Sequence, residues 1–190
     1  MSALFAVDAF AGGFIIQSIL ALWLLERHGL SIGQTAVIFF AAGVVTAFSF
    51  LVAARVAARF GLVNTMVFTH LPSNVLLILV ALMPTAWLAV LMLLARQSLS
   101  QMDVPTRQSY TMAVVDPDER PAAASVTGVA RSVSSSGSPV LAGAMLGLST
   151  FGWPLVVAGG LKIVYDLALL QQFRAVRPAE EVIPVGGAHR

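Results

Sequence analysis

A stripe of polar and charged side chains runs through an otherwise apolar part of the chain. Arg96, Ser100, Asp103 and Arg107 are spaced four, three and four residues apart, which places them on one face of an α-helix. Asp103 precedes Arg107 by four residues, and this acid-before-base order is the better one for an ion pair on a helix. A charge at the centre of a bilayer costs about 2.5–3.5 kcal/mol on insertion scales. In a membrane, the stripe must therefore face protein or water.

Two interpretations stay open for the first half of the stripe. One is that Arg96, with Gln97 and Ser100, contacts a bound small molecule or gates its passage near the middle of the membrane. The other is that these side chains hydrogen-bond to carbonyls of neighbouring helices. For Asp103 and Arg107 we favour a structural ion pair near the inner surface, which fixes helix packing and latches one conformational state.

Further ionisable side chains interrupt other apolar segments, and each needs a partner there. Asp8 is interpreted as structural rather than as a proton carrier, and Gln17 on the same segment is a candidate cavity residue. Arg131 requires a carboxylate, a carbonyl or an anion as its partner. Lys162 and Asp166 are four residues apart, so we expect them to neutralise each other.

A histidine and a surplus charge complete the set of polar features. His70, with Ser73 and Asn74, is expected to form a polar contact where two helices cross, and a proton relay through His70 is the less favoured alternative. Among the ionisable residues predicted to lie inside the membrane, the basic ones outnumber the acidic ones by one. They are Arg96, Arg107, Arg131 and Lys162, against Asp8, Asp103 and Asp166. The surplus positive charge either selects an anionic solute or pairs with an acid in a second bundle.

The composition indicates that membrane helices hold these residues. Hydrophobic residues make up 58% of the 190 residues and charged residues 11%, against about 25% charged in soluble domains. A helix needs roughly 20 mostly apolar residues to cross a bilayer. Six such windows are predicted, at residues 3–25, 34–54, 62–83, 86–106, 122–148 and 153–173. The prediction is an all-α membrane protein with antiparallel neighbouring helices, and three helices followed by three more would suit an inverted repeat.

The composition also argues against several kinds of site. The chain has no cysteine and only three histidines, so we expect no disulfide and no metal site. It has no Gly-rich phosphate-binding loop, and no cofactor is expected. A net charge of +2 gives no basis for nucleic-acid binding. A cleaved signal peptide is not expected, because Asp8 interrupts the first apolar segment.

The distribution of arginines predicts the orientation in the membrane. Five arginines lie in the even-numbered connections or after the last segment: Arg55, Arg59, Arg120, Arg174 and Arg177. The odd-numbered connections carry Arg27 alone. Because positive residues mark the cytoplasmic side, both termini are predicted to be cytoplasmic and the membrane to be the inner one. Residues 176–190 are predicted to be a disordered tail after a bundle of residues 1–175.

Three motifs resemble the C-terminal half of a major facilitator superfamily transporter. DPDERPAAAS (residues 116–125) resembles the acidic, alanine-rich connection before the eleventh helix of that family. RSVSSSGSPVLAG (Arg131–Gly143) is similar to its helix of small residues with a Gly-x-Pro step. ARVAARFG (Ala54–Gly61) resembles a degenerate copy of the family's basic loop, from which the usual acidic residue is missing. The resemblance covers nearly all of residues 3–175.

The resemblance implies a fold of twelve helices in two bundles, of which this chain would supply one. Its first, second, fourth and fifth helices would line a central cavity, with the third and sixth behind them. It further implies gradient-driven transport of a small solute by alternating access, in the efflux direction by family habit. The partners expected are the lipid bilayer and either a second six-helix half or a second copy of the chain.

Two alternatives belong to other functional classes. A non-transporting remnant or structural membrane protein is one, because six helices cannot build both walls of a two-bundle cavity. An intramembrane serine protease is the other, and it needs an activated serine with a histidine in a later helix. Here His70 precedes the serines of residues 132–138, and the chain has no GxSxG pattern. We therefore expect no enzymatic activity.

Overall fold

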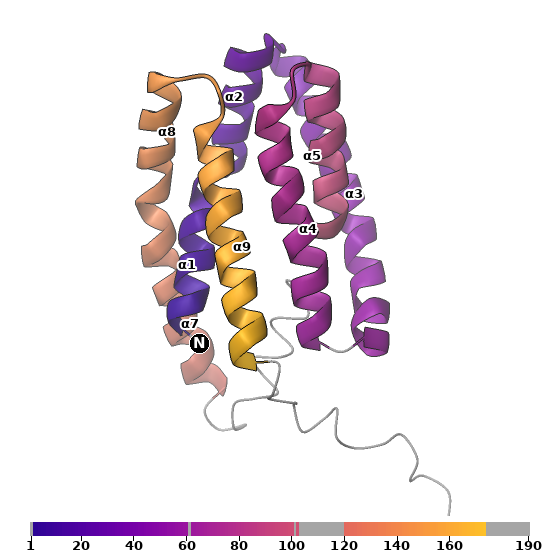
Figure 1. Cartoon of the computed structure of the whole chain (residues 1–190), viewed down its shortest axis with the longest axis vertical. Helices are drawn as coiled ribbons and strands as arrows, with labels where there is room; N and C mark the ends of the chain where they lie inside the picture. The colour runs from indigo at the N-terminus through magenta and orange to yellow at the C-terminus, as the bar shows by residue number, and fades with distance from the viewer. Residues whose placement is uncertain (1, 61, 101, 103–119, 174–190) are drawn as a thin grey trace, which may run out of the picture.

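The computed structural model describes residues 2–60, 62–100, 102 and 120–173, and the regular structure within these ranges is helical. The helices are α1 (Ser2–Gly13), α2 (Gln17–His28), α3 (Ile32–Phe60), α4 (Leu62–Leu82), α5 (Ala86–Ser100), α7 (Arg120–Ser136), α8 (Ser138–Leu148) and α9 (Trp153–Phe173). They make six passes along the bundle (Figure 1), because α1 with α2 and α7 with α8 each form one pass. The predicted all-α architecture is confirmed.

The predicted helix boundaries agree most closely with the observed ones where glycine or proline ends an apolar run. α4 ends at Leu82 against the predicted 83, and α9 occupies the predicted 153–173. α3 begins at Ile32 rather than 34, because Ser31 N donates to Gln34 Oε1 (2.8 Å) while Gln34 N donates to Ser31 Oγ (3.2 Å). This reciprocal cap starts the helix early. The predicted end of the fourth span at 106 lies outside the described residues.

The first predicted span, residues 3–25, is wrong as a single helix. α1 ends at Gly13 and α2 begins at Gln17, with Ile16 between them in an extended conformation. The backbone tightens before the break, since Phe14 N donates to Ala11 O at 3.3 Å and Ile15 N to Gly12 O at 3.1 Å. Two adjacent glycines weaken a helix by about 1 kcal/mol each relative to alanine. The pass is therefore interrupted midway.

The fifth predicted span, residues 122–148, is also two helices. α7 ends at Ser136, and α8 begins at Ser138 with Gly137 as its N-cap residue. Pro139 has no N–H, and in a continuous helix its ring would collide with the carbonyl of Ser135. Proline is well tolerated in the first turn of a helix. The chain therefore restarts the helix at this point.

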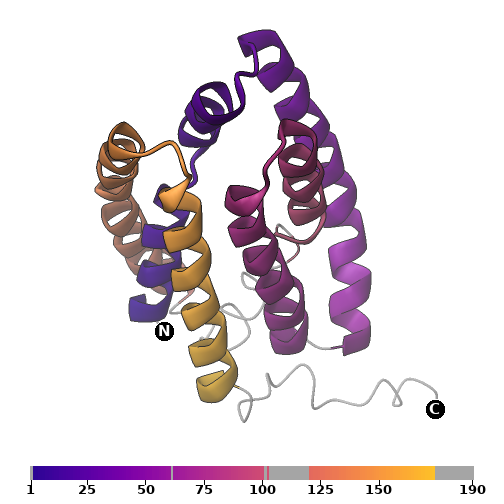
Figure 2. The same cartoon turned by 45° about the horizontal axis from the view of Figure 1, so that its top comes forward.

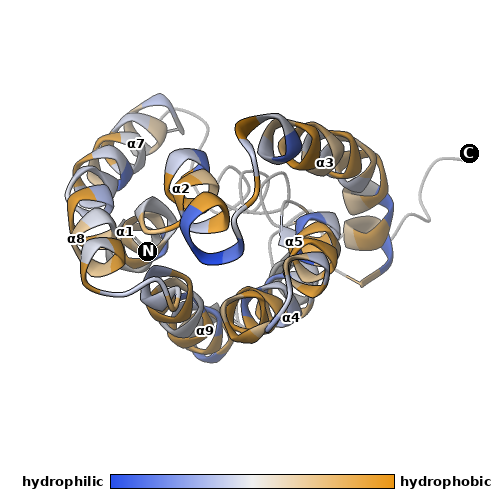
Figure 3. Cartoon of the chain, turned by 90° about the horizontal axis from the view of Figure 1, so that it is seen from above, coloured by the Kyte–Doolittle hydropathy of each residue, from blue (hydrophilic) through white to orange (hydrophobic). Residues whose placement is uncertain are grey.

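The six passes alternate in direction, and the N-terminus lies at the same end as the last residues of α9 (Figures 1 and 2). Seen along the bundle, α1, α7 and α8 lie on one side, α3 lies on the other, and α9, α4 and α5 lie between them (Figure 3). α3 exposes large apolar side chains, including Phe40 (75%) and Phe48 (66%). Three described stretches are long and apolar enough to cross a membrane: Ala6–His28, Ile32–Phe60 and Trp153–Gln171.

The helix contacts follow the pattern of an inverted repeat. α4 packs on α9, α1 packs on α7, and α3 packs on α5. In an inverted repeat, the first three passes (α1 with α2, α3, α4) correspond in order to the last three (α5, α7 with α8, α9). Under this correspondence the α1–α7 contact becomes the α5–α3 contact, and the α4–α9 contact becomes itself. The two triplets also begin at opposite ends of the bundle (Figure 1). These contacts are symmetric in the sense that suits an inverted three-plus-three repeat.

The apolar core holds α2 against the loop between α8 and α9. Trp23, Leu77 and Leu155 are fully buried within it. The Trp23 indole N–H donates to the carbonyl of Thr150 at 3.2 Å. Gly152 has φ +97, and a Cβ there would lie 2.7 Å from Trp23 Nε1. The conformation and the space at residue 152 both require glycine. The apolar core fixes this end of the bundle, and the polar side chains lie in the other part.

Close packing of α4 on α9 depends on Gly159. A Cβ at this position would lie 2.6 Å from Ile78 Cγ1 and 2.9 Å from the Asn74 carbonyl, whereas a Cβ at Gly160 would meet nothing within 4 Å. We predict that Gly159→Ala lowers the free energy of unfolding by about 1–3 kcal/mol, measured on purified protein in detergent. Gly160→Ala is the matched control and should leave stability unchanged or raise it. Equal effects of the two substitutions would contradict this packing.

Candidate functional site

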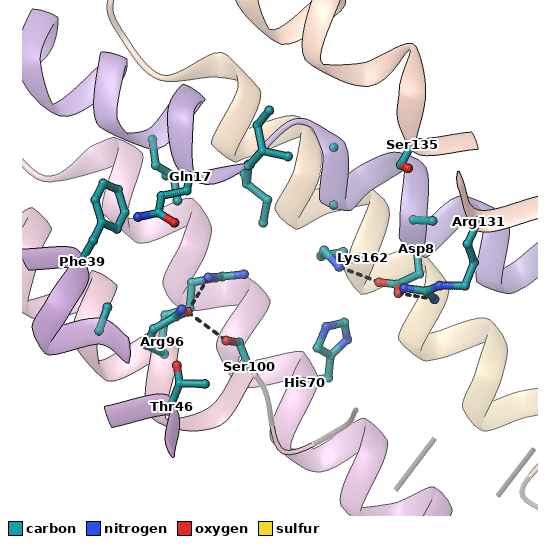
Figure 4. A pocket seen from close by; sticks show the side chains of 18 of the residues that line it. Asp8, Gln17, Phe39, Thr46, His70, Arg96, Ser100, Arg131, Ser135 and Lys162 are labelled. Atoms are coloured by element: carbon teal, nitrogen blue, oxygen red, sulfur yellow. Dashed lines mark hydrogen bonds and ion pairs between the residues drawn. The ribbon is translucent and has the colours of Figure 1, made fainter. Parts of the chain in front are cut away.

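A cavity of about 780 Å³ lies between the two sides of the bundle. Its volume is within the usual range for small-molecule sites, about 300–1,000 Å³. Residues from α1, α2, α3, α4, α5, α7 and α9 line it, together with the break between α1 and α2. Five lining side chains can carry charge: Asp8, His70, Arg96, Arg131 and Lys162. Figure 4 shows that they come from separate helices and face a common space.

Asp8 on α1 joins three helices through its two carboxylate oxygens. Lys162 Nζ on α9 donates to Oδ1 at 2.5 Å, and Arg131 Nη1 on α7 donates to Oδ2 at 3.4 Å. The lysine and aspartate side chains are only 8% and 4% exposed, while the arginine side chain is 35% exposed. A buried carboxylate needs such cations, because an unpaired charge is costly there. The structure thus gives Arg131 a carboxylate, one of the three kinds of partner that the sequence left open for it.

Close backbone approach supports this junction. A Cβ at Gly13 would lie 2.7 Å from Ser138 Oγ and 2.8 Å from the Ser135 carbonyl. Only glycine allows the end of α1 to lie this close to the joint between α7 and α8. The contact keeps α1 against α7, and it therefore keeps Asp8 within reach of Arg131.

The expected neutralisation of Lys162 by Asp166 is wrong. Both residues are on α9, but Lys162 binds Asp8 of α1 and Asp166 binds groups on α4. A pair within one helix contributes only about 0.2–0.5 kcal/mol, whereas a buried charge is stabilised most by a well-placed partner on a facing helix. Since α9 packs between α1 and α4, its two charges have different partners.

His70, Asn74 and Asp166 form a buried polar cluster between α4 and α9. His70 Nδ1 lies 2.7 Å from Asp166 Oδ1, and Asn74 Nδ2 donates to Asp166 Oδ2 at 2.9 Å. The ring of Tyr165 meets the His70 ring edge to face, with centroids 6.2 Å apart. The crossing contact expected of His70 and Asn74 is therefore present. Its partner on α9 is Asp166, which the sequence pattern had paired with Lys162. Among the described residues, the Ser73 hydroxyl has no hydrogen-bond partner in this cluster.

The predicted stripe on the fourth pass faces inward over its described part. Arg96 and Ser100 are 7% and 5% exposed, and both line the cavity with Gln97. Gln97 Oε1 accepts hydrogen bonds from Arg96 Nη1 at 3.0 Å and from Ser100 Oγ at 3.1 Å. The amide therefore orients the two neighbouring side chains. Asp103 and Arg107 lie outside the described residues, so their pairing stays a prediction.

The remaining predicted residues line the cavity or hydrogen-bond to the backbone of their own pass. Gln17 is exposed at the start of α2 and lines the cavity. Ser132 and Ser135 line it from α7, and Ser135 Oγ donates to the Ser132 carbonyl at 3.1 Å. The hydroxyls of Ser135, Ser136 and Ser138 each donate to a backbone carbonyl of the same segment. Within the described ranges, no group of three or more His, Asp or Glu side chains could hold a metal ion.

Comparison with protein families gives a match to the family described as Major Facilitator Superfamily, over residues 3–189. Comparisons with curated proteins and with solved structures give no match.

The pairing of Asp8 with Lys162 can be measured with double-mutant cycles. We predict that Asp8→Asn and Lys162→Met show a coupling energy of about 0.5–3 kcal/mol in the free energy of unfolding, because either change alone leaves a buried charge without its closest partner. Asp166→Asn with Lys162→Met is the comparison cycle, and its coupling should be smaller. Unfolding by denaturant in mixed micelles provides the four stabilities of each cycle. A larger coupling energy for the second cycle would show that Lys162 pairs with Asp166 within α9 instead.

Proposed function

Because the chain belongs to the major facilitator superfamily, we propose that it moves a small solute across a membrane by alternating access, as one of two bundles of a gradient-driven transporter. The observation that carries this proposal is the cavity with five chargeable lining residues inside an apolar bundle. Charged groups in a membrane segment mark a solute or ion pathway by default, since they are otherwise costly. The cavity volume of about 780 Å³ suits a small solute.

A second bundle completes the cavity in this proposal. Several lining residues keep solvent exposure in the single chain, among them Gln17 and Ser132. Alternating access requires two bundles that rock about a site near the middle of the membrane. The partner is either a six-helix half, with this chain as the C-terminal one, or a second copy of the chain. The motifs at residues 116–125 and Arg131–Gly143 favour the C-terminal assignment.

The proposed orientation places both termini in the cytoplasm. The ends of α3 and α9 and the start of α7 lie at the same end of the bundle as the N-terminus (Figure 1). Arg55, Arg59 and Arg120 belong to that end, and Arg27 belongs to the opposite one. The positive-inside rule then assigns the arginine-rich end to the cytoplasm. The inner membrane as location and efflux as direction are parts of this proposal.

Transport by the assembled protein tests the proposal. The chain is produced with the product of a neighbouring six-helix reading frame, or as a linked dimer of itself, and reconstituted in liposomes. Flux is measured for a panel of negative, neutral and positive solutes. We predict flux in the assembled protein and little in the monomeric chain, because one bundle cannot enclose the cavity. Assembly without flux of any solute would favour the non-transporting remnant.

Arg96 provides the site-specific test. We predict that Arg96→Ala leaves the membrane yield of the assembled protein unchanged and lowers flux at least about tenfold, the loss expected when a hydrogen bond to a charged group is removed from a bound solute. Arg55→Ala is the matched control, since Arg55 is exposed on α3 and donates only to the carbonyl of Leu51 within the described structure (3.2 Å). Full flux with Arg96→Ala would remove Arg96 from the solute site.

A further inference from the structure

The charges that line the cavity are predominantly positive. Among the described lining residues, Arg96, Arg131 and Lys162 are cationic, and Asp8 is the one carboxylate. Asp166 lies behind His70, is 1% exposed, and is held by His70 and Asn74. The described groups around the cavity carry a net positive charge even when Asp166 is counted and His70 is taken as neutral. At Asp8 itself, the two cations Lys162 and Arg131 face one carboxylate, and a local excess of positive charge in a cavity attracts anions.

Asp8 holds its two cations unequally. Lys162 is buried and contacts Asp8 at 2.5 Å, whereas Arg131 is 35% exposed and contacts it at 3.4 Å. The arginine bond is long for a charge-assisted hydrogen bond, which is usually about 2.7–2.9 Å. Asp8 is the one partner of the Arg131 guanidinium within the described part of the chain. The remaining guanidinium donors are therefore available for a planar oxyanion, which Arg binds in a bidentate manner.

The wall near Arg131 also offers polar groups and space. Ser132 and Ser135 line the cavity one and four residues further along α7. Gly12 lines it from α1, and a Cβ there would meet nothing within 4 Å. The N-cap residue Ile16 and the first residue of α2, Gln17, line the same space, and Ile16 makes no side-chain capping hydrogen bond. The N-terminus of a helix adds positive potential.

We propose that the solute bound in this cavity is an organic anion with a carboxylate or phosphate group, and that Arg131 leaves Asp8 to bind it. That the bound anion is a transported solute rests on the proposed function, but the anion site can be tested without transport. Lys162 stays with Asp8 when the anion enters, so Asp8 keeps one cation throughout. A cationic solute is disfavoured, because it would have to compete with both Lys162 and Arg131 for Asp8.

The experiment measures how anions stabilise the purified full chain in detergent. The thermal unfolding midpoint is recorded against the concentration of succinate or inorganic phosphate, at constant ionic strength with chloride. Tetraethylammonium chloride and mannitol are the cationic and neutral comparison compounds. A ligand that binds the folded state raises the midpoint in proportion to its affinity. We expect a rise with succinate, phosphate or both, and none with the comparison compounds.

Four variants assign the effect to residues. Arg131→Gln should weaken the anion affinity about tenfold or more, and Arg131→Lys should weaken it less, because the charge remains without the bidentate fork. Arg55→Gln removes the same charge from an exposed site on α3 and should have no effect. Asp8→Asn should lower the midpoint without anion and make the anion-induced rise larger, since the anion then replaces the missing carboxylate. Mere loss of packing does not produce that gain.

Each outcome decides the proposal. The pattern above supports it. No midpoint rise with either anion, or an equal loss of the rise in Arg131→Gln and Arg55→Gln, overturns it. If anions bind at Arg131 but the assembled protein moves no solute, the anion site stands and the transport function falls. If the assembled protein moves a neutral or cationic solute and no anion binds, the transport function stands and the anion site falls.

Discussion

A carboxylate buried among helices must be matched by cations, because an uncompensated charge in an apolar bundle costs several kcal/mol. Asp8 imposes this constraint on α1, α7 and α9 together, since Lys162 and Arg131 both reach it. The three helices can be packed in few ways that keep both contacts. The glycine at residue 13, which lets α1 approach the joint of α7 and α8, is a local requirement of that packing. The broken passes therefore converge where the charges do.

A second polar layer continues from the first along α9. Asp166 is one helical turn beyond Lys162 and is satisfied by His70 and Asn74 of α4, where Gly159 allows the two helices to touch. His70 also lines the cavity, so this layer connects α4 and α9 to the same space as Asp8. The apolar core around Trp23 holds the opposite end of the bundle. Rigid packing at one end and paired charges around a cavity suit a bundle that carries a site while it moves as a unit.

The sequence allowed prediction of what depends on composition and periodicity. The bounds of α9 and α4 follow from apolar runs that end at charges, glycine or proline, and the inward face of Arg96 and Ser100 follows from helical spacing. The breaks at residues 14–16 and at Gly137 were not predicted, because both lie inside runs apolar enough to pass as single spans. Gly12–Gly13 and the Gly137–Pro139 step were the available signals.

Partner choice was the harder part. The i,i+4 rule gave Lys162 to Asp166, but the rule describes isolated helices and takes no account of facing ones. Once α9 lies between α1 and α4, each charge turns to a neighbour that is 92–154 residues away in the sequence. The surplus of one positive charge was visible from counting alone. That Asp8 is shared between two cations, Lys162 and Arg131, required the structure.

In a membrane-embedded bundle the polar residues must face protein or water, and the cavity is the water-accessible space that they line. The chain contains no cysteine, so single thiols can be introduced at two adjacent positions of α7. Ser132 lines the cavity, whereas Val133 is 69% exposed and lies outside the described lining. The decisive measurement is the rate at which a charged, water-borne thiol reagent modifies Ser132→Cys and Val133→Cys in reconstituted membranes. We predict faster modification of Ser132→Cys, because Val133→Cys faces lipid; modification of Val133→Cys at an equal or higher rate would contradict the account.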